Sequence, residues 1–152
     1  MAGQIGLVTR ALPAAVFVPE ETLKRIVRKI ALLSDDKRAT KEICLIRSGY
    51  YKANTDQVIL YQHQSTMSPP KADLLKVVNC KVIDIIPDNR LMMGAPQEDV
   101  SFINFMKEFW DKSLELDSPI TLIICNNLRG RLVDKYVDDF RLHSSLPSKS
   151  QE

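Results

Sequence analysis

Hydrophobic and polar positions follow each other along the chain in two spacings, one typical of helices and the other typical of strands. In residues 19–34, apolar side chains recur three or four positions apart after Pro19, and proline is common at the first position of a helix. Asp35-Asp36-Lys37 then interrupts this spacing, which places the helix end near Ser34. The same spacing recurs in residues 96–116 and in residues 128–140. These three ranges are predicted to be the main helices.

Five segments have the patterns of strands, and they lie at 4–9, 14–18, 42–50, 56–63 and 120–125. Leu12-Pro13 separates the first two, and proline restricts that connection to a turn or a sheet edge. Lys52-Ala53-Asn54-Thr55 offers a turn between the third and the fourth, so these two predict a hairpin. The last segment is continuously apolar, which indicates a strand covered on both faces.

Residues 72–86 have a mixed pattern that fits two interpretations. A short helix over 72–78 followed by a buried strand over 80–86 is one of them, and one long irregular strand is the other. Asp73 and Lys76 break a period of two, so we favour the helix followed by a strand.

The order of these elements predicts a single α+β domain over residues 1–142. We expect a mixed, mainly antiparallel sheet with three or four helices packed against it, because the first half supplies antiparallel pairs and the second half one parallel crossover. The chain has 152 residues, enough for one domain with its own core. Residues 143–152 are polar and are predicted to be a flexible tail.

The composition of the chain indicates in which cellular compartment the protein works and which class of partner it binds. The 21 basic and 19 acidic residues nearly balance, so no global positive field marks the chain as an obligate nucleic-acid binder. The three cysteines are widely spaced in apolar segments, which fits reduced thiols in the cytoplasm or nucleus. Met1-Ala2-Gly3-Gln4 does not resemble a signal peptide, and no apolar run reaches transmembrane length, so we expect neither secretion nor a transmembrane segment.

Candidate catalytic chemistry is sparse. The glycines form no phosphate-binding motif, and the two histidines have no metal-ligand spacing, so we predict no cofactor and no metal site. Asp84 and Asp88 flank a predicted strand end and are the best candidates for an acid–base pair, although alternation favours an outward Asp84. We therefore expect a protein that is not an enzyme.

A cluster of basic residues between positions 24 and 41 is the first feature that indicates binding. Its members are Lys24, Arg25, Arg28, Lys29, Lys37, Arg38 and Lys41. Such an arc can bind the phosphates of RNA or the headgroups of an anionic membrane. Alternatively it is a solvated helix face, because Glu20 and Glu21 stand four residues before Lys24 and Arg25.

Apolar side chains in excess of a single helix face are the second feature. In the 96–116 helix the flank Ile103, Trp110 and Leu114 widens the apolar arc, and the segment Leu91-Met92-Met93 adds an apolar loop. These six residues are candidates for a protein-binding surface, and packing inside the fold is the alternative. The leading hypothesis is a non-enzymatic interaction protein, such as an adaptor or a self-assembling structural protein. The alternative hypothesis is an RNA- or anionic-membrane-binding protein that uses the basic cluster.

Overall fold

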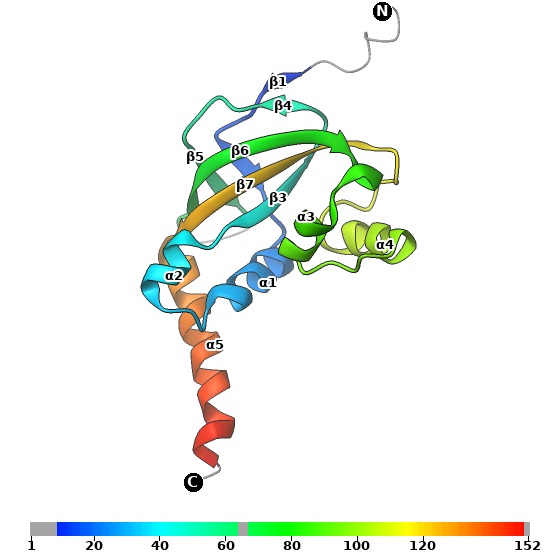
Figure 1. Ribbon diagram of the computed structural model, residues 1–152. Helices are drawn as coiled ribbons and strands as arrows, with labels where there is room; N and C mark the ends of the chain where they lie inside the picture. Colours follow the sequence, from blue (N-terminus) through cyan, green and yellow to red (C-terminus); the bar gives the residue numbers. More distant parts are fainter. Residues whose placement is uncertain (1–8, 64–66, 151–152) are drawn as a thin grey trace, which may run out of the picture.

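The computed structural model describes residues 9–63 and 67–150, with the backbone alone over 144–150 (Figure 1). Its elements, in chain order, are β1 (Arg10–Ala11), β2 (Ala15–Phe17), α1 (Glu20–Ile30), α2 (Asp35–Thr40), β3 (Ile43–Ser48), β4 (Tyr51–Lys52), β5 (Gln57–Tyr61), β6 (Lys71–Lys81), the short 3-10 helix η2 (Val82–Asp84), α3 (Pro87–Met92), α4 (Asp99–Phe109), β7 (Pro119–Arg129) and α5 (Arg131–Ser150). The predicted strand at 4–9 lies almost wholly outside the described residues.

Five strands form the main sheet, in the order β2-β5-β6-β7-β3. The pair β2/β5 is parallel, and the other three pairs are antiparallel. The short strands β1 and β4 form a second, parallel pair. The predicted α+β fold with a mixed, mainly antiparallel sheet is therefore confirmed.

Strand β7 is covered on both faces, as its continuous apolar run predicts. Ile123 faces one hydrophobic core and Leu122 faces the other, and both side chains are buried. Strand β3 pairs with β7 along its whole length and alternates in the same way, with Leu45 in the first core and Ile46 in the second. The sheet therefore separates two cores at this end.

Helices α1 and α5 close the first core, and α3 and α4 close the second (Figure 1). Helix α1 buries Leu23, Val27 and Ile30 of the apolar stripe that its sequence predicts, together with the polar Thr22. Its C-terminal end is fixed by Arg141 of α5, whose Nε donates to the carbonyl of Ala31 at 2.6 Å. Because α1 also lies beside α4, it joins the two cores.

The contact between α5 and α1 is expected to weaken in alkaline solution. Burial and the carboxylate of Glu20, which accepts a hydrogen bond from the Tyr136 hydroxyl at 3.2 Å, raise the pKa of Tyr136 to about 12. The folded pKa thus exceeds the unfolded value of about 10, so this stabilisation is complete below about pH 10 and is lost as the pH rises toward 12. At neutral pH, the free energy of unfolding of the Y136F variant should be about 0.5–1.5 kcal/mol lower than that of the wild type. In urea titrations the difference from the wild type should shrink above pH 10; a constant difference would contradict this assignment.

Residues 71–81 form one strand, so the favoured helix over 72–78 was wrong and the alternative of a long irregular strand is confirmed up to Lys81. The predicted strand does not continue to residue 86, because Val82–Asp84 form the 3-10 helix η2. The pairing of β6 with β7 shifts register between Lys71 and Asp73 and again between Leu74 and Lys76. The first shift places its extra residue in β7, whereas the second places it in β6 and reverses the faces to which the later β6 side chains point, so the sequence does not keep a period of two.

Strands β3 and β5 do not form the predicted hairpin. They lie at different positions in the sheet, since β3 pairs with β7 while β5 lies between β2 and β6. After β3 the chain turns at Gly49, whose φ is +93°, and the backbone N–H of Tyr51 donates to the side chains of Asn79 and Thr121. These bonds direct the chain across the sheet rather than back along β3. The parallel pairs also lie in the first half of the chain, and not in the second half as predicted.

Several predicted helix boundaries were also wrong. The last helix, predicted from residue 128, begins at Arg131, because Leu128 still belongs to β7. Helix α4 ends at Phe109 instead of reaching residue 116, because the carboxylate of Asp111 accepts hydrogen bonds from both the N–H and the hydroxyl of Ser113. Such local bonds compete with helix formation. Residues 35–37, predicted to end the first helix, instead begin the separate helix α2.

The pairing of β6 is one-sided over most of its length. Strand β5 pairs only with residues 71–73 of β6, and one further bond joins the N–H of Leu74 to the carbonyl of Asp56 at 2.8 Å. Over residues 75–81, no described strand pairs with the edge opposite β7, although β4 contacts this part of β6 through the bond from the N–H of Tyr51 to the side chain of Asn79. Lys76 and Lys81 are exposed in this stretch.

Helix α5 runs away from the sheet at its C-terminal end and includes residues 143–150 of the predicted tail (Figure 1). The mobility of that segment stays a prediction. Within the described part of the chain, no helix is both long enough and apolar enough to cross a bilayer.

Candidate functional site

A groove runs between α1 and α2 on one side and α3 and α4 on the other. Its wide outer part encloses about 770 Å³ and its narrow inner end about 30 Å³. Lys29, Lys41, Glu42 and Met92 line both parts, so the two adjoin each other. We call this feature the basic groove.

Four cations of the predicted cluster line the basic groove: Arg25, Lys29, Lys37 and Lys41. None of the four forms an ion pair with a carboxylate of the described residues. Two carboxylates, Glu42 and Asp88, also line the outer part, which leaves an excess of positive charge.

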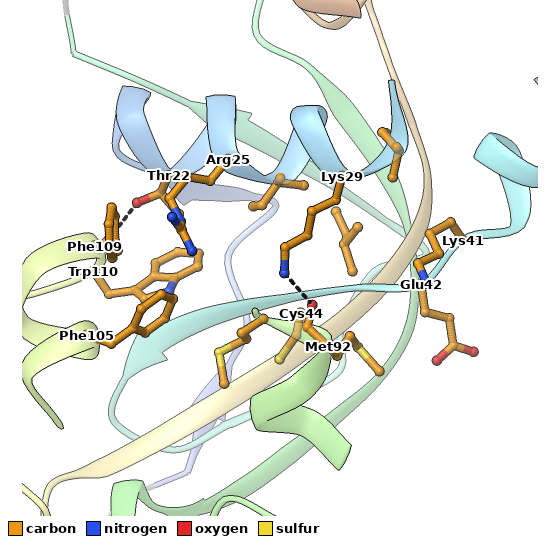
Figure 2. Close-up of a pocket in the computed structure, with 14 residues that line it drawn as sticks. Thr22, Arg25, Lys29, Lys41, Glu42, Cys44, Met92, Phe105, Phe109 and Trp110 are labelled. Atoms are coloured by element: carbon orange, nitrogen blue, oxygen red, sulfur yellow. Dashed lines mark hydrogen bonds between the residues drawn. The ribbon is translucent and has the colours of Figure 1, made fainter. Parts of the chain in front are cut away.

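Lys29 lies at the centre of this positive charge and points into the groove from α1 (Figure 2). Its ammonium donates to the carbonyl of Met92 at 3.5 Å. Its pKa is lowered from the ordinary value, first because burial removes water from the ammonium and then because Arg25 and Lys41 repel it. An anion in the groove would relieve that repulsion.

A glycine gives Lys29 the space that it occupies. Gly94 has φ +71°, and a Cβ at this position would lie 2.0 Å from the Lys29 ammonium. Any side chain at residue 94 would therefore displace the end of Lys29 and would strain the backbone as well.

The inner wall of the groove is aromatic (Figure 2). The guanidinium carbon of Arg25 lies 4.3 Å from the ring centre of Phe109 and 5.3 Å from that of Phe105. The hydroxyl of Thr22 donates to the carbonyl of Phe109 and so fixes α1 against the end of α4. The stacked guanidinium keeps its N–H groups available, because cation–π contacts use the face of the group and not its edge.

The outer wall is aliphatic and comes from Leu33, Leu91 and Met92. The Leu91 side chain is 70% exposed, a large exposed fraction for an apolar residue. A partner that covers this side chain would gain hydrophobic free energy of about 1.5–3 kcal/mol.

The other three predicted cations lie outside the groove. Lys24 pairs with Glu20, as the four-residue spacing indicated for a solvated helix face, and also with Glu21 three residues before it. The pair of Glu21 with Arg25 that the same spacing predicted does not form. Arg28 stacks on the ring of Phe140 at 4.7 Å, and Arg38 pairs with Asp35 at 3.2 Å. Helix α1 thus directs its basic residues to two sides, with Arg25 and Lys29 facing the groove.

The six candidates for protein binding are divided between core and surface. Ile103 and Leu114 are buried in the second core, so a partner cannot reach them without unfolding this region. Met93 is also buried, although it lines the inner groove. Leu91, Met92 and Trp110 remain accessible at the groove.

Asp84 and Asp88 do not form a shared pocket. Both are exposed, Asp84 in the 3-10 helix η2 and Asp88 in the first turn of α3. Cys44 lies in the groove wall, but burial raises the pKa of its thiol far above the ordinary value, and burial raises that of Cys125 to about 12. Among the described residues, no three His, Cys, Asp or Glu side chains lie together in a group that could hold a metal ion.

Sequence patterns missed the residues that complete the groove. Glu42 and Cys44 flank the start of β3, and nothing in their spacing from α1 or α3 signals a shared site. Phe105 and Phe109 were recognisable only as a helical apolar stripe.

Comparisons of the chain with protein-family models, with curated proteins and with solved structures give no match. The function must therefore be inferred from the geometry of the groove.

Proposed function

We propose that this chain is a non-enzymatic protein-interaction domain whose basic groove binds an acidic, amphipathic segment of a partner protein. The proposal depends on the convergence of four cations without carboxylate partners on one groove. Lys29, Lys37 and Lys41 line its outer part together with the aliphatic wall, and Arg25 lines its inner end. Within the basic cluster, Lys24 and Arg38 lie outside the groove and pair with carboxylates instead.

The two walls specify the chemistry of the bound segment. Carboxylates of the partner would lie near Lys29, Lys37 and Lys41, and an apolar side chain would cover Leu91. Complementary charge gives such contacts their orientation and association rate, while the apolar anchor contributes affinity. This proposal combines the basic cluster and the Leu91–Met92 surface into one site.

RNA and anionic membranes fit the groove less well. A concave groove keeps Lys29 away from the plane of a bilayer, where surface-bound cations interact with headgroups. Single-stranded nucleic acids bind mainly by stacking bases on open aromatic faces, whereas the face of Phe109 is already covered by Arg25. The outer wall is aliphatic.

A peptide selection tests the proposal directly. A library of random twelve-residue peptides on phage is selected against the immobilised full chain, with the K29E/K41E variant as counter-selection. Enriched peptides should carry Asp or Glu beside Leu, Ile or Met. Their affinity should fall at least about 100-fold for the double variant, because two attractive charges become repulsive.

Matched variants keep the readout specific to the groove. The K76E/K81E variant changes the net charge by the same amount as K29E/K41E, but on β6, so it should retain peptide binding. L91S should weaken binding, whereas V100S, which alters an exposed valine on α4, should not. Peptides enriched equally on the wild type and the double variant would refute the proposal. So would saturable, groove-dependent binding of phosphatidylserine vesicles or single-stranded RNA in the absence of acidic peptides.

A further inference from the structure

A second cavity, separate from the proposed peptide groove, lies between the two edge strands of the main sheet, β2 and β3. It encloses about 240 Å³, and residues of both strands line it together with Trp110 and Asp111. We propose that this cavity binds a free amino acid in its zwitterionic form, with an apolar or aromatic side chain.

Arg47 of β3 supplies the site for a carboxylate. Its Nε is fully buried and has no hydrogen-bond partner among the described atoms. Its guanidinium lies 4.9 Å from the ring centre of Tyr51, which fixes the plane of the group. Because this Nε has no exposed surface, it does not itself contact a ligand in the cavity; a carboxylate there would be met by the terminal N–H groups of the planar guanidinium, whose geometry matches the two carboxylate oxygens.

Asp111 supplies the opposite charge in the same cavity. It lies beyond ion-pair distance of Arg47, since no ion pair of described residues includes either side chain. Hydrogen bonds from the backbone and hydroxyl of Ser113 lower the pKa of Asp111, so the carboxylate stays ionised. The hydroxyl of Ser48 donates to its second oxygen at 3.4 Å, a contact long enough to yield to an ammonium group.

The separation of two unlike charges in one small cavity selects a ligand that carries both. A simple anion would be repelled by Asp111 and a simple cation by Arg47. The remaining walls include the aromatic residues Phe17, Tyr51 and Trp110. A volume of about 240 Å³ is below the range of about 300–1,000 Å³ that is typical of pockets for drug-sized ligands, which fits a molecule of amino-acid size.

Trp110, the single tryptophan of the chain, reports on this cavity. Its fluorescence is followed while the full chain is titrated with L-phenylalanine, L-leucine or L-methionine. The two matched analogues of phenylalanine are hydrocinnamate, which lacks the amine, and phenethylamine, which lacks the carboxylate. At least one amino acid should give a saturable change, and each analogue should bind at least about tenfold more weakly than phenylalanine or not at all.

Variants assign the signal to the cavity. R47Q and D111N should each reduce the affinity for the amino acid at least about tenfold. K112Q alters an exposed neighbour of Asp111 and should leave the affinity unchanged. The proposal is overturned if no amino acid changes the fluorescence, if hydrocinnamate or phenethylamine binds as tightly as phenylalanine, or if R47Q has no effect. None of these outcomes depends on peptide binding in the groove.

Discussion

Replacing Arg90 with methionine is expected to lower the free energy of unfolding by about 2–4 kcal/mol, although the residue lines neither proposed site. The Arg90 side chain is only 6% exposed and makes four hydrogen bonds. Three of them go to the carbonyls of Ile83, Ile85 and Gln97, at 2.8–3.0 Å. Methionine fills much of the space but leaves these carbonyls without donors. Urea denaturation followed by circular dichroism measures the loss.

Two further substitutions separate the hydrogen bonds of Arg90 from its charge. R90K keeps the charge but cannot reproduce the forked geometry, so it should be nearly as destabilising as R90M. D99N removes the carboxylate that Arg90 contacts at 3.0 Å, yet Asp99 is 52% exposed, so its loss should cost less than about 1 kcal/mol. If D99N were the more damaging change, the ion pair and not the carbonyl network would hold this region.

Truncating Phe102 to alanine should reduce the free energy of unfolding by about 3–5 kcal/mol, the largest effect that we expect from a single substitution in α4. Phe102 has no exposed surface and lies in the second core, where it anchors α4 to the sheet. V100A changes a residue of the same helix that is 61% exposed, and it should shift stability by less than about 0.5 kcal/mol. A loss below about 2 kcal/mol for F102A would mean that the core collapses into the cavity.

Arg90 and Phe102 should also be energetically coupled. The guanidinium carbon of Arg90 lies 4.2 Å from the ring centre of Phe102, within cation–π distance. A double-mutant cycle with R90M and F102L, which removes the ring but keeps most of the volume, should give a coupling of about 0.5–2 kcal/mol. Additive effects would show that the ring only fills space.

Local patterns predicted the elements whose environment is uniform along their length. Helix α1 has one buried stripe, and β7 has both faces in a core, so spacing alone identified each of them. The prediction for β6 was wrong because the bulge between Leu74 and Lys76 changes the face that the later residues occupy. The partner of β3 is β7, more than 70 residues later in the chain, and no local turn signal encodes such a pairing.

The candidate site was predictable in its ingredients and not in its assembly. The basic cluster and the Leu91-Met92 segment were both visible as excess charge and excess apolar surface. Their convergence depends on α3 lying opposite α1, about 60 positions apart in sequence. Arg47 gave no signal, because a single arginine at the end of an apolar strand is ordinary, and only the cavity around it makes its Nε notable.

The one-sided pairing of β6 has a consequence for how these molecules behave at high concentration. A bare strand edge exposes main-chain donors and acceptors to which another strand can add, which is a route to fibrous aggregates. Stacking two copies along residues 75–81 would bring the lysines at 76 and 81 of each copy close together. Their mutual repulsion, together with the bulge beside Leu75, opposes such growth, so neutralising these two lysines would remove a barrier to polymerisation.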